Sequence, residues 1–125
     1  MPVLSYVDQK DLRTLGSELR QRLVEIRSGK ISPEHLSGGT FTITNLGAYD
    51  VDGFTPVINL PEAAIQGVGR ITPKAVVREG KVVARTMVTL SLVFDHRLVD
   101  GAPAAQFLKY LKEMIENPNE VTLTL

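Results

Sequence analysis

One short segment of the sequence combines residue types that can move protons near neutral pH. His96 lies between Asp95 and Arg97, and Asp100 follows it four positions later. An imidazole can act as a general base at this pH. A structural role among charged neighbours is the alternative for His96, and we expect Asp95 and Arg97 to form structural ion pairs. One histidine and two carboxylates within a turn lack the further ligands of a closed metal site, so we expect no metal.

A hydrophobic segment and a helix are expected to position this histidine. Residues 87–94 are nearly all apolar and rich in strand-forming types, which is typical of a central strand covered on both faces. Pro103 begins a segment with apolar residues at helical spacing: Phe107, Leu108, Leu111, Met114 and Ile115. We therefore expect His96 in a turn between a buried strand and a helix. The other histidine, His35, lies in a polar segment and is expected on the surface.

The rest of the chain predicts one amphipathic helix followed by short strands. The helix is indicated by apolar residues at spacings of three and four, Leu12, Leu15, Leu19, Leu23 and Ile26. It is expected to begin after an N-cap at Asp8 and to end near Gly29. Strands are predicted at residues 1–6, 40–45, 57–58 and 63–68, with a hairpin turning at Glu79-Gly80. This order predicts an α/β fold, a layered sandwich of a mixed sheet with helices.

Composition is that of an ordinary globular domain. A chain of 125 residues with 43% hydrophobic content forms at most one domain. Fourteen basic residues balance fourteen acidic ones, so we expect neither nucleic acid nor a membrane surface as partner. The absence of cysteine excludes disulfides and a cysteine nucleophile. No apolar run approaches the roughly 20 residues of a spanning helix, and no signal-peptide pattern is present, so we expect a cytoplasmic protein.

Several motifs, in the same order, resemble those of one enzyme family. The sequences GGTFTITNLG (residues 38–47), FTPVINLPEAAI (54–65) and FDHRLVDG (94–101) resemble the dihydrolipoamide acyltransferases, the core (E2) components of 2-oxo acid dehydrogenase complexes. The last motif is shared, in a looser form, with chloramphenicol acetyltransferase. The resemblance covers nearly the whole chain and implies part of the chloramphenicol acetyltransferase-like fold. It identifies residues 1–125 as the C-terminal part of the catalytic domain, without a lipoyl or subunit-binding domain.

The resemblance implies acyl transfer between a dihydrolipoyl thiol and the thiol of coenzyme A. An ordinary thiol has a pKa of about 8.5 and is mostly protonated at neutral pH, so its attack on a thioester needs a base. By resemblance, His96 is that base, Asp100 helps to orient the catalytic residues, and Thr44 donates a hydrogen bond to the oxyanion of the tetrahedral intermediate. A purely structural role in a strand is the alternative for Thr44. Coenzyme A and the lipoyl group are expected as substrates.

The resemblance also implies an assembly. In the family the active site lies between subunits of a trimer, with the histidine from one subunit and the hydroxyl from its neighbour, and the trimers build larger cores. We therefore expect a homotrimer or larger core. The expected partners are a lipoyl domain and the E1 and E3 components of the complex.

The resemblance covers only the C-terminal half of the family's catalytic domain, since family members begin well before the segment equivalent to Val3. Three interpretations stay open: a fragment or split product of an acyltransferase, a small acyltransferase that completes its surface by oligomerising, or a non-catalytic scaffold piece of such a complex. The presence of both His96 and Thr44 favours an acyltransferase, and the truncation favours the first interpretation. Acetyl, succinyl and branched-chain acyl groups all remain candidates.

Overall fold

Two units make up the part of the chain that the computed structural model describes, residues 1–118. The first unit spans residues 1–40, and the second spans Phe41–Pro118. The last seven residues of the predicted catalytic-domain range, 119–125, lie outside the described residues. The assignment of residues 1–125 to a single part of a catalytic domain therefore stays a prediction.

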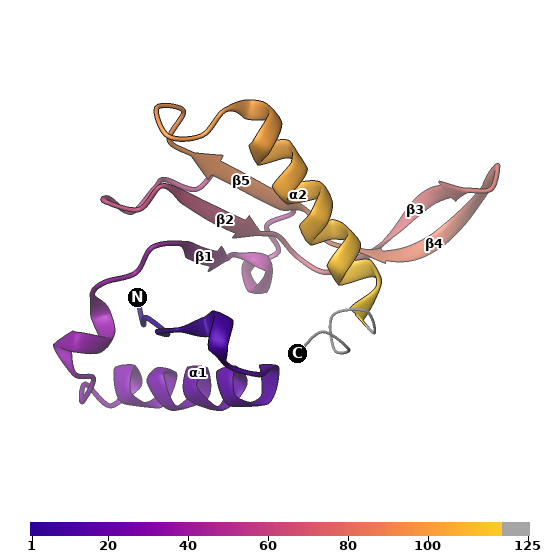
Figure 1. Ribbon diagram of the computed structural model, residues 1–125. Helices are drawn as coiled ribbons and strands as arrows, with labels where there is room; N and C mark the ends of the chain where they lie inside the picture. Colours follow the sequence, from indigo (N-terminus) through magenta and orange to yellow (C-terminus); the bar gives the residue numbers. More distant parts are fainter. Residues whose placement is uncertain (119–125) are drawn as a thin grey trace. The chain divides into compact units, whose positions relative to one another are not determined.

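The first unit is built around the predicted amphipathic helix, α1 (Leu12–Arg27) (Figure 1). Its N-cap is Asp11, so the prediction of Asp8 was wrong. The Asp11 carboxylate accepts a hydrogen bond from the Thr14 N–H at 2.7 Å, and this bond lowers the pKa of that carboxyl. Asp8 is too early in the chain to reach the first turn of α1. The helix ends as predicted, with Gly29 in the left-handed region at φ 67°.

Two short 3₁₀ helices, η1 (Val7–Gln9) and η2 (Pro33–Leu36), flank α1. The strand predicted for residues 1–6 is wrong, because this segment pairs with no strand. Its Val3 N–H instead donates to the carbonyl oxygen of His35 at 2.8 Å. The His35 side chain is half-buried, with Nδ1 3.8 Å from Glu25 Oε2, and is less exposed than predicted.

The second unit contains a three-stranded mixed sheet. Its strands are β1 (Thr42–Asn45), β2 (Ala64–Val68) and β5 (Leu90–Phe94), in the order β1-β2-β5. β1 runs parallel to β2, and β5 runs antiparallel to it. Helix α2 (Gly101–Glu116) contacts β5 (Figure 1). The predicted α/β class with a mixed sheet is therefore confirmed.

The strand that leads to His96 lies at an edge of this sheet. The prediction of a central strand covered on both faces is wrong for β5, since β2 occupies the centre. The hydrophobic run of residues 87–94 is in fact divided between two sheets, because Met87 ends β4 (Lys81–Met87). Within the described residues β5 pairs with β2 alone, which leaves its side chains half-buried.

The predicted hairpin is confirmed as β3 (Thr72–Arg78) paired with β4. Glu79 and Gly80 form its turn with φ angles of 51° and 74°. Positive φ at both central residues is the geometry that suits a two-residue turn between twisted strands. A short η3 helix (Gly47–Tyr49) follows β1. The strand predicted at residues 57–58 is wrong, because this segment forms no regular element and finds no pairing partner.

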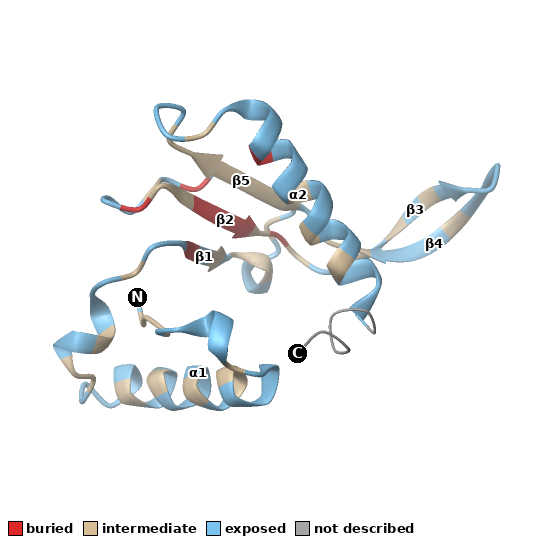
Figure 2. Cartoon of the chain, viewed as in Figure 1, coloured by how far each residue is buried: buried red, intermediate tan, exposed pale blue. Residues whose placement is uncertain are grey.

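Few apolar side chains are buried in this fold (Figure 2). Among residues 1–118, the buried hydrophobic residues are Ile65 on β2 and Ala104 on α2. Large apolar side chains are exposed on both units, including Tyr6, Leu12, Ile43, Val57, Leu60, Ile71, Val82, Leu98 and Tyr110. A folded domain of ordinary size encloses a larger core than this. No helix within the described range has the length and apolar character needed to cross a membrane.

Candidate active site

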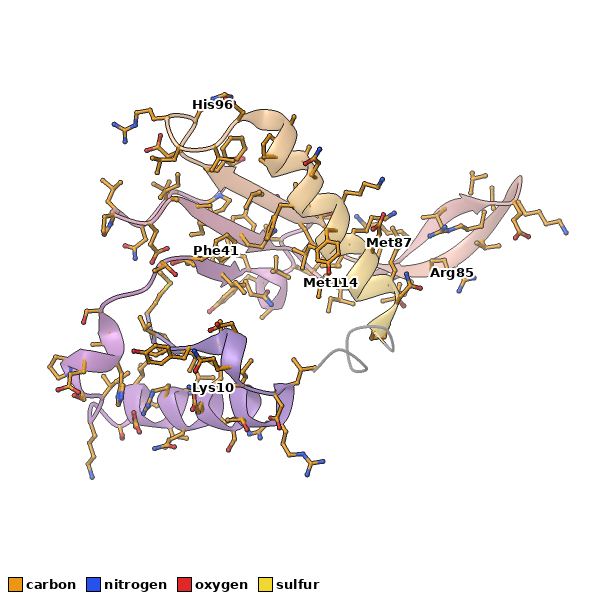
Figure 3. The ribbon with its side chains drawn as sticks, in the orientation of Figure 1. Lys10, Phe41, Arg85, Met87, His96 and Met114 are labelled. Atoms are coloured by element: carbon orange, nitrogen blue, oxygen red, sulfur yellow. The ribbon has the colours of Figure 1, made fainter. Side chains whose placement is uncertain are left out.

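His96 lies in the turn that joins β5 to α2, as predicted (Figure 3). Its side chain is 71% exposed, and its Nδ1 lies 3.8 Å from Asp100 Oδ1. The Phe94 ring packs beside the imidazole, with the ring centroids 5.7 Å apart. The turn thus brings His96 and Asp100 together and leaves most of the imidazole open to a reacting group.

The Asp100 carboxylate makes no capping hydrogen bond, although Asp100 is the N-cap of α2. An aspartate at this position usually accepts a hydrogen bond from the first turn of its helix. In α2 the Asp100 side chain forms no such bond, and only its backbone carbonyl accepts, from the Ala104 N–H at 3.3 Å. The carboxylate therefore stays beside the imidazole. A negative charge there attracts the imidazolium that forms when a histidine base takes up a proton.

Asp95 and Arg97 form the predicted ion pair on either side of His96. The Asp95 carboxylate accepts a hydrogen bond from the Arg97 backbone N–H at 2.9 Å. Arg97 Nε lies 3.0 Å from both oxygens of the same carboxylate. The guanidinium, and then the backbone N–H, lower the pKa of Asp95 to about 2. Asp95 is therefore a stable anion at every pH at which an imidazole could work as a base.

Thr44 lies on β1, in register with Gly67 of β2, whose partner on the other side is Ser91 of β5. The Thr44 side chain is half-buried, and its hydroxyl forms no hydrogen bond within residues 1–118. A Cβ at Gly67 would lie 3.2 Å from the Phe54 ring and 3.3 Å from Pro56. Phe54 and Pro56 therefore pack over the sheet at the level of Thr44. The sequence prediction assigned them no role, although a glycine inside a strand is a signal for such a close approach.

The threonine side of β1 faces inward. Thr42 is 7% exposed, whereas Ile43 is 68% exposed. The strand ends directly afterwards, where Asn45 Oδ1 accepts a hydrogen bond from the Gly47 N–H at 2.7 Å. A Cβ at Gly47 would lie 2.6 Å from the backbone oxygen of Gly69. This close backbone contact fixes the end of the strand next to the candidate hydroxyl.

A single chain does not bring His96 and Thr44 together. Thr44 is level with Ser91 across the sheet. Phe94 lies three residues farther along β5, which is about 10 Å in an extended strand, and the two strand spacings add about 10 Å sideways. His96 lies beyond that end of β5. The distance between the two side chains is therefore far outside hydrogen-bond reach.

The described part of the chain offers no group of three or more His, Cys, Asp or Glu side chains arranged to hold a metal. The site consists of an exposed imidazole, a neighbouring carboxylate, an ion pair and a separate hydroxyl. An imidazole can transfer a proton, and a hydroxyl can stabilise an oxyanion.

Comparisons with known proteins match the chain over nearly its whole length. The family described as "2-oxoacid dehydrogenases acyltransferase (catalytic domain)" matches residues 1–123. The chain is similar to the dihydrolipoyllysine-residue acetyltransferase component of the pyruvate dehydrogenase complex from Bacillus subtilis (strain 168). The two are 41% identical over 123 residues, which cover 98% of this chain and 28% of the relative.

Solved structures show the same likeness. The dihydrolipoamide acetyltransferase of Azotobacter vinelandii matches with a TM-score of 0.90 and 38% identity, over 97% of this chain and 50% of that one. The roles of a serine, a histidine and an asparagine in its catalytic mechanism have been investigated. The cubic core of the pyruvate dehydrogenase multienzyme complex matches with the same score, identity and coverage. The predicted fold, part of the chloramphenicol acetyltransferase-like fold, is thereby confirmed, and the chain spans about half the length of these solved chains.

Proposed function

We propose that this chain, which belongs to the family of 2-oxoacid dehydrogenases acyltransferase (catalytic domain) proteins, carries the residues for acyl transfer. The transfer runs between a dihydrolipoyl thiol and coenzyme A. The observation that carries this proposal is the exposed imidazole of His96, held in a turn with the Asp100 carboxylate 3.8 Å away. An imidazole so placed can take a proton from a thiol and return it after transfer.

The spacing of three candidate residues supports the assignment. In the Azotobacter vinelandii relative, the investigated serine precedes the histidine by 52 positions, and the asparagine follows it by four. In this chain Thr44 precedes His96 by 52 positions, and Asp100 follows it by four. Threonine supplies a hydroxyl as serine does. Asp100 provides a carboxylate in place of an amide, which adds a negative charge beside the imidazole.

In the proposed reaction His96 acts first as a base and then as an acid, so the same steps can run in either direction. His96 removes the proton from the attacking thiol, and the thiolate adds to the carbonyl carbon of the thioester. The carbonyl oxygen becomes an oxyanion, which accepts a hydrogen bond from the Thr44 hydroxyl. The tetrahedral intermediate then breaks its original carbon–sulfur bond. The departing thiolate takes the proton back from His96, so the enzyme returns to its starting state.

The site is proposed to form between copies of the chain. His96 and Thr44 of one chain lie at different ends of the sheet, so a working pair needs the hydroxyl of a second copy. The likeness to a cubic core supports a homotrimer or a larger assembly built from trimers. The exposed apolar side chains of the described residues supply surface that such an assembly could cover.

The relatives also guide the choice of substrates and partners. We propose coenzyme A and a lipoyl group as substrates, the latter carried by a lipoyl domain, with no metal in the reaction. Acetyl is the acyl group that the names of the relatives favour. The proposed partners are the E1 and E3 components of a pyruvate dehydrogenase-type complex in the cytoplasm.

A non-catalytic core or scaffold piece is the second candidate function. It is favoured by the small number of buried apolar residues in the described chain, which suits a piece that completes its fold within an assembly.

The deciding experiment measures acyl transfer from a panel of acyl-coenzyme A donors to dihydrolipoamide. The chain is compared with its His96→Ala variant, and His35→Ala serves as the matched control in the other unit. Loss of turnover by about 10²-fold or more in His96→Ala alone supports the acyltransferase. Absence of turnover from folded, assembled protein favours the scaffold.

A further inference from the structure

We propose that Asp95 is a positioning residue for His96, because its carboxylate closes the turn that fixes the direction of the imidazole. This inference rests on the proposed function, in which His96 is the base. It assigns to Asp95 a geometric task rather than contact with substrate.

The backbone of Asp95 anchors the turn to the sheet. Its N–H donates to the Ala63 carbonyl oxygen at 2.9 Å, which extends the pairing of β2 and β5 by one residue. Its own carbonyl oxygen accepts from the Leu98 N–H at 2.9 Å and from the Val99 N–H at 3.1 Å. The turn therefore begins at Asp95, one residue before His96, and both backbone polar groups of Asp95 are bonded.

The carboxylate of Asp95 closes the same turn from the inside. It accepts a hydrogen bond from the Arg97 backbone N–H at 2.9 Å, two residues along the chain. Aspartate and asparagine form such bonds readily because their side chains are short. The side chain of Asp95 is 18% exposed, whereas that of its ion-pair partner Arg97 is 84% exposed. The carboxylate is thus a built-in part of the turn, and the guanidinium covers it from outside.

His96 has little other support. Its side chain is 71% exposed, and its described neighbours are the Asp100 carboxylate at 3.8 Å and the Phe94 ring at 5.7 Å between centroids. An imidazole that makes few contacts takes its direction from its own backbone. Three hydrogen bonds between Asp95 and residues 97–99, one to its carboxylate and two to its carbonyl oxygen, span His96 and set that backbone. Loss of the Asp95 carboxylate should therefore release the imidazole from Phe94 and Asp100 together.

The charge and the shape of Asp95 can be separated by substitution. Asp95→Asn keeps an oxygen that can accept the Arg97 N–H and removes the charge. Asp95→Glu keeps the charge and lengthens the side chain, so it no longer fits the two-residue turn. Asp95→Ala removes both. If Asp95 acts by geometry, Asn preserves the position of His96, whereas Glu and Ala do not.

The test is NMR on the full chain, with measurement of proton signals that depend on the conformation of the turn. In the parent protein we expect a nuclear Overhauser effect between the His96 and Phe94 rings and slow exchange of the Arg97 amide. Asp95→Glu and Asp95→Ala should weaken the ring contact and speed that exchange by about tenfold or more, while Asp95→Asn restores both. His35, which lies in the other unit, is the internal control and should not change. Retention of the parent signals in Asp95→Glu with their loss in Asp95→Asn would overturn the geometric role.

Steady-state kinetics of the assembled, active protein are the second test, in which kcat and KM of the variants are compared. Asp95→Glu should lower kcat by about tenfold or more with KM within about twofold, and Asp95→Asn should restore kcat. An equal loss in Asn and Glu, or a change in KM alone, would contradict positioning. The NMR reading needs no turnover, so a failure of the proposed function, seen as no effect of His96→Ala, is distinguishable from a failure of this inference.

Discussion

Thr44 and His96 lie at opposite ends of the three-stranded sheet, since Thr44 is level with Ser91 and His96 follows Phe94 at the far end of β5. The two groups cannot act on one substrate within one chain. Any site that uses both must take them from different copies, and this requirement can be tested with variants that each lack one group.

Mixed assemblies should recover activity that neither parent has. We expect His96→Ala and Thr44→Ala chains, unfolded and reassembled together in equal amounts, to reach about a quarter of the wild-type activity per site. An interface is complete only when its histidine comes from a Thr44→Ala chain and its hydroxyl from a His96→Ala chain, which random mixing in a closed ring gives about once in four. The measurement is acyl transfer after reassembly.

The doubly substituted chain, His96→Ala with Thr44→Ala, is the control for this mixing experiment. Reassembled with either single variant, it should give no recovery. Absence of recovery in the test mixture despite proven co-assembly would argue that one chain supplies both groups. Recovery in a control mixture would show that the group missing from all of its chains is not required for the reaction.

The Thr44 hydroxyl should matter through its hydrogen bond and not through its shape. Thr44→Val keeps the branched side chain on β1 but removes the donor, so we expect kcat to fall by about 10²–10³-fold. Thr44→Ser keeps the donor and should stay within a few-fold of wild type. Steady-state kinetics check the result, and unfolding curves verify that all variants fold. A fully active Thr44→Val would remove Thr44 from the mechanism.

The close backbone contact at the end of β1 predicts a stability effect. Gly47→Ala would place a Cβ 2.6 Å from the backbone oxygen of Gly69, so part of the backbone must shift. We expect a loss of about 1–3 kcal/mol in the free energy of unfolding, as for other overpacking substitutions. Gly101→Ala is the control, because a Cβ there meets nothing within 4 Å. Denaturant titration measures both, and equal stabilities would contradict the contact.

The Asp95–Arg97 pair predicts a pH dependence with a definite sign. The pKa of Asp95 is lowered in the folded state from 3.8 to about 2, chiefly by the Arg97 guanidinium. The pair therefore contributes stability at pH values above 3.8, and this contribution is lost as the pH falls from 3.8 towards 2. Carbon-13 NMR of the carboxyl groups should show Asp95 titrating near pH 2. In Arg97→Gln the midpoint should rise, and an unchanged midpoint would contradict the pairing.

Local signals in the sequence predicted much of the fold. The helical spacing of α1, the Glu79-Gly80 turn and the position of His96 between a strand and a helix all depend on residues close together in the chain. The N-cap of α1 offers a contrast, because Asp8 and Asp11 both precede the helix and only the local backbone decides that Asp11 caps it.

Local signals in the sequence could not predict the order of the strands in the sheet. β5 looked central because its residues are apolar, yet β2 occupies the centre of the sheet. The pairing of β1 with β2 joins residues 23 positions apart in the chain, and the register decides that Thr44 meets Gly67. The packing of Phe54 over that glycine depends on the same register. Apolar character alone could not distinguish a strand buried in its own chain from one whose faces need covering.

Ile65 and Ala104 are the buried hydrophobic residues of residues 1–118. Because so few apolar residues are buried, the stability of the fold should depend on protein concentration. If copies cover one another's apolar surface, association stabilises the folded form relative to the unfolded one. The midpoint temperature of thermal unfolding should then rise with protein concentration. Dilution would then weaken the fold and the shared site together. Variants of this chain are therefore comparable only at matched molar concentration, where the same fraction of chains is assembled.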